Sequence, residues 1–245
     1  MKPLVRWILL LLSAFLALQL FFILRIAAMA AIDPQSTAFQ RSEAWRVATT
    51  GKNGLRWRQQ WVDYASIADS LKRAVIASED DGFMQHDGVD WDAIETAWQR
   101  NAKAEEQAAR RVRKGTSRPA PPPKIVGGST ITQQLAKNLL LSGERTLVRK
   151  GQEVMLTFAL ETLLTKKRIL EIYLNSVEWG EGVFGAEAAA QHYFRKSAAR
   201  LTPYEAARLA VMLPRPRVYE KLPDSPYLSG RAQSVAARMG NAQLP

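Results

Sequence analysis

The sequence predicts a mainly α fold preceded by one membrane-spanning helix, and three patterns support this prediction. Past Gly151, apolar residues recur at helical spacing almost without interruption, which favours helices over residues 153–164 and 166–175. Thr202-Pro203-Tyr204-Glu205 is a capping box with proline at the first helical position, and it opens a helix that ends before Pro214. Strand signals are sparse and internal repeats are absent. Helices therefore account for most of the predicted fold.

The N-terminal segment is long and apolar enough to cross a bilayer. Residues 8–24 carry no charge, and apolar residues continue after Arg25 as far as Ile32. A bilayer core needs roughly 20 apolar residues in a helix, which the segment supplies if Arg25 extends to the interface. Ala28-Met29-Ala30 is similar to a signal-peptide cleavage site, but the apolar run is long for a signal core. We therefore expect an uncleaved anchor.

Positive charges lie on both sides of this segment, so the positive-inside rule gives no clear orientation. Lys2 and Arg6 precede the segment, and further Lys and Arg residues follow it. The short tail favours a cytoplasmic N-terminus with the rest of the chain outside. These features divide the chain into a tail and anchor (1–32), a connecting segment (33–64) and one domain (65–245).

Composition indicates an anionic partner. The 245 residues carry a formal net charge of +11, with a pI near 10.1. Such an excess favours nucleic acid, an anionic membrane surface or a phosphorylated substrate. The chain has no cysteine, which excludes disulfides and thiolate metal sites. With His86 and His192 as its only histidines, a histidine-rich metal centre is disfavoured.

Two more helices are predicted in the first half of the domain. Apolar side chains at helical spacing lie just before the acidic segment at Glu79: Leu71, Val75 and Ile76. A second stripe with the same spacing consists of Trp91, Ile94 and Trp98. We expect the second stripe to lie in the core rather than on a binding surface.

Residues 100–124 combine strong basic charge with a proline-rich end. The proline run from Pro119 to Pro123 cannot continue a helix, so this segment is predicted to be a loop or mobile flap. Its basic side chains suit either solvent or anionic lipid headgroups, and we favour a solvated face.

Three consecutive carboxylates follow the first of these helices and precede a glycine-containing turn. Burial or a neighbouring like charge raises a carboxyl pKa toward the range useful for a general base. Glu79, at the end of the helix, is the best placed of the three to lie in a cleft wall. Asp80 and Asp81 also suit a turn cap. The spacing from Asp87 to Asp92 does not match an EF-hand calcium loop.

A possible phosphate cradle follows at residues 127–134, Gly-Gly-Ser-Thr-Ile-Thr-Gln-Gln. Its backbone N–H groups, hydroxyls and amides precede a predicted helix, which suits phosphate oxygens but also an ordinary helix cap. No Gly-Lys-Ser/Thr of a Walker loop follows. Lys137 shares a helical face with Gln133, and Arg145 adds a forked donor.

Arg149 and Glu153 lie four residues apart, so an intrahelical ion pair and a role at the site are both open. Spacing alone does not place Glu153 relative to Glu79. Together, acids suited to proton transfer and cations suited to phosphate indicate chemistry at a carbon whose leaving group is a phosphate.

Five ordered motifs between about Leu71 and Pro216 resemble the peptidoglycan glycosyltransferases of glycosyltransferase family 51. These motifs are Glu79-Asp80 with Phe83, His86 and Gly88; residues 128–134; Arg149-Lys150 with Glu153; residues 167–175 with Gly180, Gly182 and Gly185; and residues 206–214. No transpeptidase domain follows, so we expect a monofunctional enzyme.

The resemblance implies a lysozyme-like domain that polymerises lipid II into β-1,4 glycan strands on the outer face of the bacterial inner membrane. Glu79 would be the general base of an inverting reaction that releases undecaprenyl diphosphate, and Asp80 would support it. Glu153 would be the second essential carboxylate and would help to hold any divalent cation, Mg²⁺ or Mn²⁺, near the diphosphate. Tyr173 and Asn175 would shape the cleft floor.

The resemblance also implies a set of substrate contacts: Ser129, Thr130, Gln133, Gln134, Lys137, Arg145, Arg149 and Lys150. The expected partners are lipid II, the growing glycan strand, inner-membrane lipids and proteins of cell wall synthesis or division, and not nucleic acid. One departure is Gln152, because some relatives place a lysine directly before the third-motif glutamate.

Two other functions are alternatives: a membrane-anchored peptidoglycan-cleaving enzyme of lysozyme-like fold, and a non-catalytic basic scaffold. A glycoside hydrolase needs a carboxylic acid that protonates a sugar oxygen, beside a second carboxylate. A diphosphate leaving group needs cations instead. The pair Lys137 and Arg145 therefore favours synthesis over cleavage.

Overall fold

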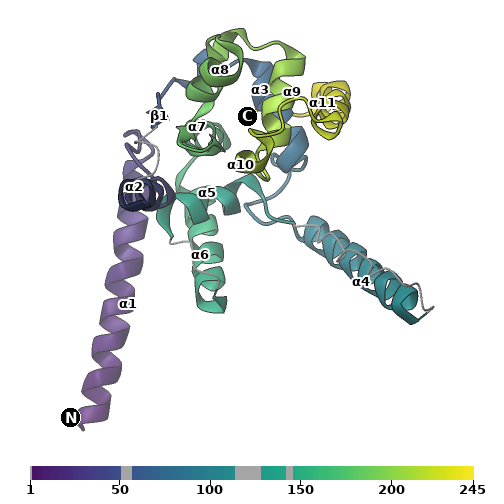
Figure 1. Ribbon diagram of the computed structural model, residues 1–245. Coiled ribbons are helices and arrows are strands. Elements are labelled where there is room, and N and C mark those ends of the chain that lie inside the picture. Colours follow the sequence, from purple (N-terminus) through teal and green to yellow (C-terminus); the bar gives the residue numbers. More distant parts are fainter. Residues whose placement is uncertain (1, 51–56, 114–127, 142–145) are drawn as a thin grey trace.

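The computed structural model describes residues 2–50, 57–113, 128–141 and 146–245, and helices dominate this part of the chain (Figure 1). The prediction of a mainly α fold is confirmed. The helices are α1 (Pro3–Ala28), α2 (Ala38–Thr50), α3 (Asp69–Glu79), α4 (Trp91–Arg113), α5 (Ile131–Leu140), α6 (Leu147–Leu163), α7 (Lys166–Ser176), α8 (Ala186–Phe194), α9 (Pro203–Met212), α10 (Pro216–Tyr219) and α11 (Pro226–Arg238). The strands are β1 (Arg58–Gln59), β2 (Glu178–Gly180) and β3 (Val183–Phe184), and the 3₁₀ helices are η1 (Tyr64–Ser66), η2 (Ala198–Arg200) and η3 (Met239–Asn241).

Helix α1 extends away from the rest of the molecule (Figure 1). Its 26 residues have a mean hydropathy of 2.6 over the apolar window. At 1.5 Å per residue they span about 39 Å, which exceeds the roughly 30 Å of a bilayer core. Near its C-terminal end, Ile26 and the capping residue Met29 are buried against the domain. Helix α1 is therefore long and apolar enough to cross a bilayer and is packed onto the domain at one end.

Arg168, at the start of α7, attaches the end of α1 to the domain. Its Nε donates to the Met29 carbonyl oxygen at 2.7 Å. The same guanidinium forms ion pairs with Asp33 and Glu171, each at 2.7 Å. A guanidinium with its donors shared among three acceptors holds a fixed geometry. The chain that leaves α1 is thus held against the domain from its first residues.

The predicted connecting segment, residues 33–64, contributes regular structure to the domain. Helix α2 lies against α5, and β1 pairs in parallel with β3, with Arg58 opposite Val183. Strand β2 pairs antiparallel with β3, which gives the sheet order β1-β3-β2. Gly185 follows β3 with φ of 85°, and a Cβ there would lie 2.7 Å from the Asn175 carbonyl oxygen. Only glycine, which has no Cβ, allows the backbone at this position to pass so close to Asn175.

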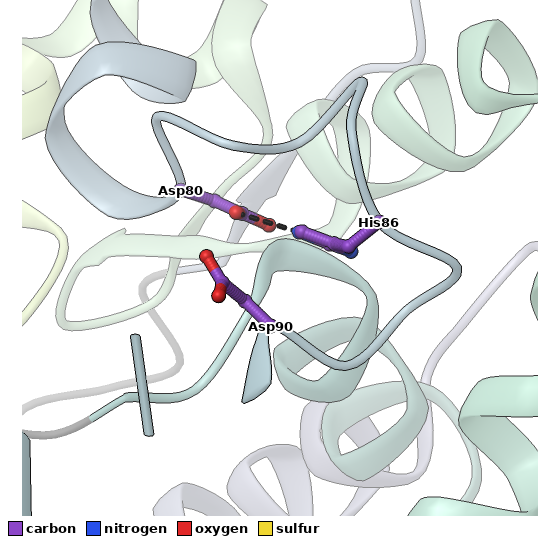
Figure 2. A group of neighbouring side chains, drawn as sticks. All are labelled: Asp80, His86 and Asp90. Carbon is purple, nitrogen blue, oxygen red and sulfur yellow. Dashed lines mark hydrogen bonds and ion pairs between the residues drawn. The ribbon is translucent and has the colours of Figure 1, made fainter. Parts of the chain in front are cut away.

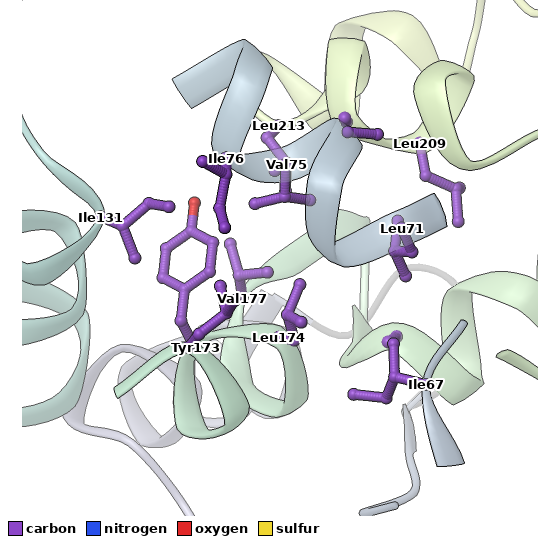
Figure 3. Close-up of a cluster of buried hydrophobic side chains, with 14 of the residues drawn as sticks. Ile67, Leu71, Val75, Ile76, Ile131, Tyr173, Leu174, Val177, Leu209 and Leu213 are labelled. Atoms are coloured by element: carbon purple, nitrogen blue, oxygen red, sulfur yellow. The ribbon is translucent and has the colours of Figure 1, made fainter. Parts of the chain in front are cut away.

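The core lies between α3, α5, α7 and α9 (Figure 3). The apolar residues predicted before Glu79 belong to it: Leu71, Val75 and Ile76 are at most 1% exposed. Trp179 is fully buried, and its indole N–H donates to the Leu209 carbonyl oxygen at 3.1 Å. At the edge of this core, Asp80 after α3 accepts a hydrogen bond from the Ile131 N–H, which connects the end of α3 to the start of α5.

Threonine caps begin α5, α6, α7 and α9. Thr202 and Glu205 form the predicted capping box, which is therefore confirmed. Thr130 and Gln133 form a second capping box at the start of α5. Each cap satisfies backbone N–H groups that a helix leaves unpaired, and its loss typically costs about 1 kcal/mol.

The prediction of a loop over residues 100–124 is wrong for residues 100–113, because these residues form the second half of α4. Alanine, glutamine, glutamate and arginine dominate this stretch and have high helix propensity, and the first proline comes only at Pro119. Residues 114–124 of the predicted loop lie outside the described residues.

The core position predicted for the tryptophan stripe is also wrong. Trp91 and Trp98 are 67% and 76% exposed. Their spacing correctly predicted a helix, but α4 leads away from the rest of the domain (Figure 1), so the stripe does not reach the core. Periodicity identifies a helical face without identifying what covers it.

Candidate active site

Glu79 is the last residue of α3, half-buried at the edge of the core. Burial raises the pKa of its carboxyl above the ordinary value of 4.5. A hydrogen bond from Gln134 lowers this pKa, the charge of Asp80 raises it, and that of Lys137 lowers it, so that the net direction is upward. A carboxylate whose pKa is raised is a stronger base than one with the ordinary pKa. The sequence predicts such a raised pKa for a general base, and Glu79 has it.

The side chain of Gln134 connects Glu79 to α7. Gln134 Nε2 donates to Glu79 Oε2 at 2.9 Å, and its Oε1 accepts from the Tyr173 hydroxyl at 3.0 Å. Tyr173 is 1% exposed and lies between Ile76 and Ile131 in the core (Figure 3). Because the phenol donates to the amide oxygen, the amide nitrogen must face Glu79. Tyr173 thus orients a donor toward the carboxylate, a role that sequence reasoning missed.

Asp80 is buried, and its carboxylate is hydrogen-bonded to the start of α5. Its Oδ2 accepts from the Ile131 backbone N–H at 2.9 Å, and its Oδ1 lies 2.9 Å from His86 Nε2. The Gly88 N–H donates to His86 Nδ1 at 3.1 Å, which places the imidazole proton on Nε2. His86 therefore donates to Asp80. This geometry fits the supporting role predicted for Asp80.

Asp80, His86 and Asp90 lie close enough together to suggest a metal site (Figure 2). However, Asp90 Oδ1 accepts from the Ala93 N–H at 2.7 Å and so caps α4. The proton on His86 Nε2 leaves no lone pair facing the two carboxylates. Hydrogen bonds at the starts of α4 and α5 account for this cluster.

A cationic pocket of about 480 Å³ lies between α5 and the N-terminal half of α6. It contains most of the substrate contacts that the sequence predicted. Its lining is Ser129, Gln133, Gln134, Lys137, Thr146, Leu147, Arg149, Lys150 and Glu153. Arg145 lies outside the described residues. The structure therefore gathers cations from two helices around one cavity.

Glu153 is buried in this pocket and bonded to two cations of its own helix. Its Oε2 accepts from Arg149 at 3.0 Å, and its Oε1 accepts from Lys150. The intrahelical pair that the sequence left open is therefore present, and Glu153 also lines the pocket, whereas its role in the reaction stays a prediction. A buried carboxylate between two cations holds their charges at the pocket wall.

Thr130 has a different position from the one predicted. It is 2% exposed, its hydroxyl donates to the Gly88 carbonyl oxygen at 2.6 Å, and it caps α5. It does not line the pocket, because the cap turns its side chain into the protein. Gln133 shares this capping box but also lines the pocket.

A second cavity of about 400 Å³ continues from the first. Gln134, Lys137 and Arg149 line both cavities, and the second adds residues from α2, α10 and β2, among them Phe39, Glu178 and Pro216. Gln134, the hydrogen-bond partner of Glu79, therefore lies where the two cavities meet. Leu213 and Pro214 of the fifth motif also line this cavity, but Phe39, Glu178 and Pro216 belong to no motif, so sequence reasoning missed them.

The described residues thus form a helical domain behind an apolar helix, with a carboxylate of raised pKa beside a cationic pocket. A family model described as transglycosylase matches residues 47–240. The chain therefore belongs to the transglycosylase family. The matched region begins within α2, so it includes β1 and the sheet as well as the helical core.

Curated relatives cover nearly the whole chain. A protein named biosynthetic peptidoglycan transglycosylase from Burkholderia thailandensis is 51% identical over 233 residues, which are 95% of this chain and 84% of the relative. A protein of the same name from Paraburkholderia xenovorans is 49% identical over 232 residues, 95% of this chain and 89% of the relative. That from Herminiimonas arsenicoxydans is 48% identical over 246 residues, covering 100% and 99%. The predicted membership of a peptidoglycan glycosyltransferase family is confirmed.

Proposed function

We propose that the protein polymerises lipid II into β-1,4-linked glycan strands by an inverting transfer, with Glu79 as the general base. The observation that carries the proposal is the position of Glu79. Its carboxylate is bonded to Gln134, which lines both cavities, and Lys137 from the same wall acts on its pKa. The names of the relatives support the substrate class.

In the proposed reaction, Glu79 removes the proton from the 4-hydroxyl of the acceptor GlcNAc. The hydroxyl oxygen attacks C1 of the donor MurNAc from the face opposite the diphosphate, and the bond from C1 to the diphosphate oxygen breaks. The electron pair leaves with undecaprenyl diphosphate, and the proton stays on Glu79. The raised pKa of Glu79 matches this proton transfer.

The leaving group needs positive charge rather than a protonating acid. Lys137, Arg149 and Lys150 line the first cavity and supply that charge, and Ser129 adds a polar group. Glu153 holds Arg149 and Lys150 in place. Two cavities that share one wall give separate places for the donor and the acceptor.

The residues described in the cationic pocket do not fit a divalent cation well. Glu153 is the carboxylate among them, and both of its oxygens already accept from cations. A hard cation prefers several oxygen ligands, which the diphosphate itself would have to supply. The proposed steps therefore use the side chains of this protein and the substrate alone.

The proposed location is the bacterial inner membrane, with α1 as a single-pass anchor, a cytoplasmic N-terminus and the domain in the periplasm. Lipid II and the growing strand are the proposed substrates, and inner-membrane lipids surround the anchor. Proteins of cell wall synthesis or division are proposed partners. Peptidoglycan cleavage is the weaker candidate, because Glu153 is paired with two cations and is unsuited to protonating a sugar oxygen.

The test is polymerisation of lipid II by the full-length protein in detergent, with glycan chains resolved by length. Glu79→Gln keeps the shape of the side chain and its contact with Gln134 but removes the base, so chain growth should be abolished. Asp81→Asn, two residues further along the chain and exposed, is the matched control and should stay active. Chain growth by a folded Glu79→Gln protein would contradict the base assignment. Fragments released from purified glycan strands would favour the cleaving enzyme.

A further inference from the structure

One face of α1 meets the domain, and this face contains a glutamine. Gln19 and Phe22 are half-buried, and Ile26 and Met29 are buried, whereas most other residues of α1 are exposed. The spacing of these four residues follows a single helical stripe. Gln19 lies inside residues 8–24, the apolar stretch predicted to cross the bilayer. The contact between α1 and the domain therefore extends into the membrane segment.

The partner of Gln19 is Gln152 of α6, and the two amides satisfy each other. Gln19 Nε2 donates to Gln152 Oε1 at 3.1 Å, and Gln152 Nε2 donates to Gln19 Oε1 at 2.9 Å. Helices α1 and α6 extend from the domain on the same side (Figure 1) and contact each other. An amide without a partner is costly in hydrocarbon, so a reciprocal pair disfavours sliding or rotation of one helix against the other.

Gln152 directly precedes Glu153 in the cationic pocket. Its side chain is absent from the pocket lining and is bonded to Gln19 of α1 instead. The helix that carries Arg149, Lys150 and Glu153 is thus attached to the membrane segment at the level of the pocket.

We propose that the Gln19–Gln152 pair is a positioning contact that fixes the height of the cationic pocket relative to the bilayer. At that height the pocket meets the phosphate of a substrate whose lipid tail stays in the membrane. This inference rests on the proposed function for its substrate, but the contact itself is tested without activity. Neither glutamine touches the reacting atoms, so both act through α6.

The kinetic test uses the full-length protein in liposomes that contain lipid II, with Gln19→Leu, Gln152→Leu and the double variant. Each single change should raise KM by roughly 3- to 15-fold, the range expected for an interhelical hydrogen-bonded pair in a membrane, and leave kcat nearly unchanged. The double variant should be no worse than either single variant, because one lost amide already ends the pairing. Ser13→Leu, whose exposed hydroxyl bonds only its own helix, is the control with unchanged KM.

The absence of cysteine from the chain permits a second test. Gln19→Cys combined with Gln152→Cys introduces a single thiol pair. A short, cleavable bifunctional thiol reagent, which spans the distance that the two amides bridged, should crosslink the pair in liposomes and return KM to the value of the unmodified protein, and cleavage of the reagent should raise KM again. A failure to crosslink, or a wild-type KM in Gln19→Leu, would overturn the proposal. If the unmodified protein does not polymerise lipid II while the crosslink forms, the proposed function fails but the contact stands.

Discussion

Tyr173 and Glu79 are joined through a single amide group, that of Gln134. The phenol donates to the amide oxygen, and the amide nitrogen donates to the carboxylate. One buried hydroxyl on α7 therefore determines which end of the amide faces the proposed base on α3. The hydrogen bond from Gln134 lowers the pKa of Glu79 and opposes the effect of burial.

Tyr173→Phe should raise the pKa of Glu79 by freeing this amide. Without the phenolic donor the amide can turn, and Glu79 loses a donor that stabilises its charged form, so the pKa of Glu79 rises further. A base works only when deprotonated, so the acid limb of the pH profile of kcat/KM should move to higher pH. Profiles of lipid II polymerisation measure the shift. Tyr193→Phe, which removes a hydroxyl bonded to the Trp179 carbonyl oxygen, is the control with an unmoved limb.

Asp80→Asn should move the same limb in the opposite direction. The charge of Asp80 raises the pKa of Glu79, and an amide removes that charge. The amide cannot accept with both of its polar atoms, so either the Ile131 N–H or the His86 N–H loses its partner, at a cost of about 1–3 kcal/mol. We therefore expect lower stability toward urea and an acid limb at lower pH. An inactive protein that is fully folded would instead indicate that Asp80 itself takes part in the chemistry.

Glu79→Gln should change how stability depends on pH. Burial raises the pKa of Glu79 above 4.5 in the folded state, so in the window above 4.5 the folded protein binds more protons than the unfolded one. Stability then falls as pH rises through this window, and the glutamine variant lacks the effect. Urea unfolding near pH 4 and near pH 8 should show the variant gaining stability relative to the unmodified protein only at the higher pH. An equal difference at both values would show that the pKa is not raised.

Two tryptophan substitutions should distinguish the exposed stripe of α4 from the buried core by their effects on stability. Trp179→Ala removes a fully buried ring and should destabilise the domain by about 3–5 kcal/mol. Trp98→Ala removes a ring that is 76% exposed and should change stability by less than about 0.5 kcal/mol. Thermal unfolding of the two variants measures the difference. A large loss from Trp98→Ala would mean that α4 packs against the domain in solution.

The local features of the fold could be predicted from the sequence. The capping box at Thr202 and the helix that ends at Glu79 depend on neighbours a few residues apart, and both are as predicted. The pairing of Arg149 with Glu153 follows from their spacing on one helix. The position of Trp98 was mispredicted, because periodicity gives a face but not its surroundings.

The site was only partly predictable for the same reason. The sequence identified Glu79, Lys137 and Glu153 by residue type and motif. It gave no means to find the partners of Gln134 and Gln152, because Tyr173 and Gln19 come from helices distant in the chain. Such contacts depend on how helices pack, which no local pattern records.

Under the proposed function, the attachment of α1 by Arg168 also determines how the protein meets its substrate. Because the guanidinium of Arg168 is bonded to Met29 and Asp33, no flexible linker separates the domain from the proposed anchor. Enzyme and lipid-borne substrate would then diffuse in one plane, and the orientation of the catalytic face would be set before they meet. Turnover should depend on the number of substrate molecules per unit of membrane area, and dilution of the vesicles at constant surface density should leave it unchanged.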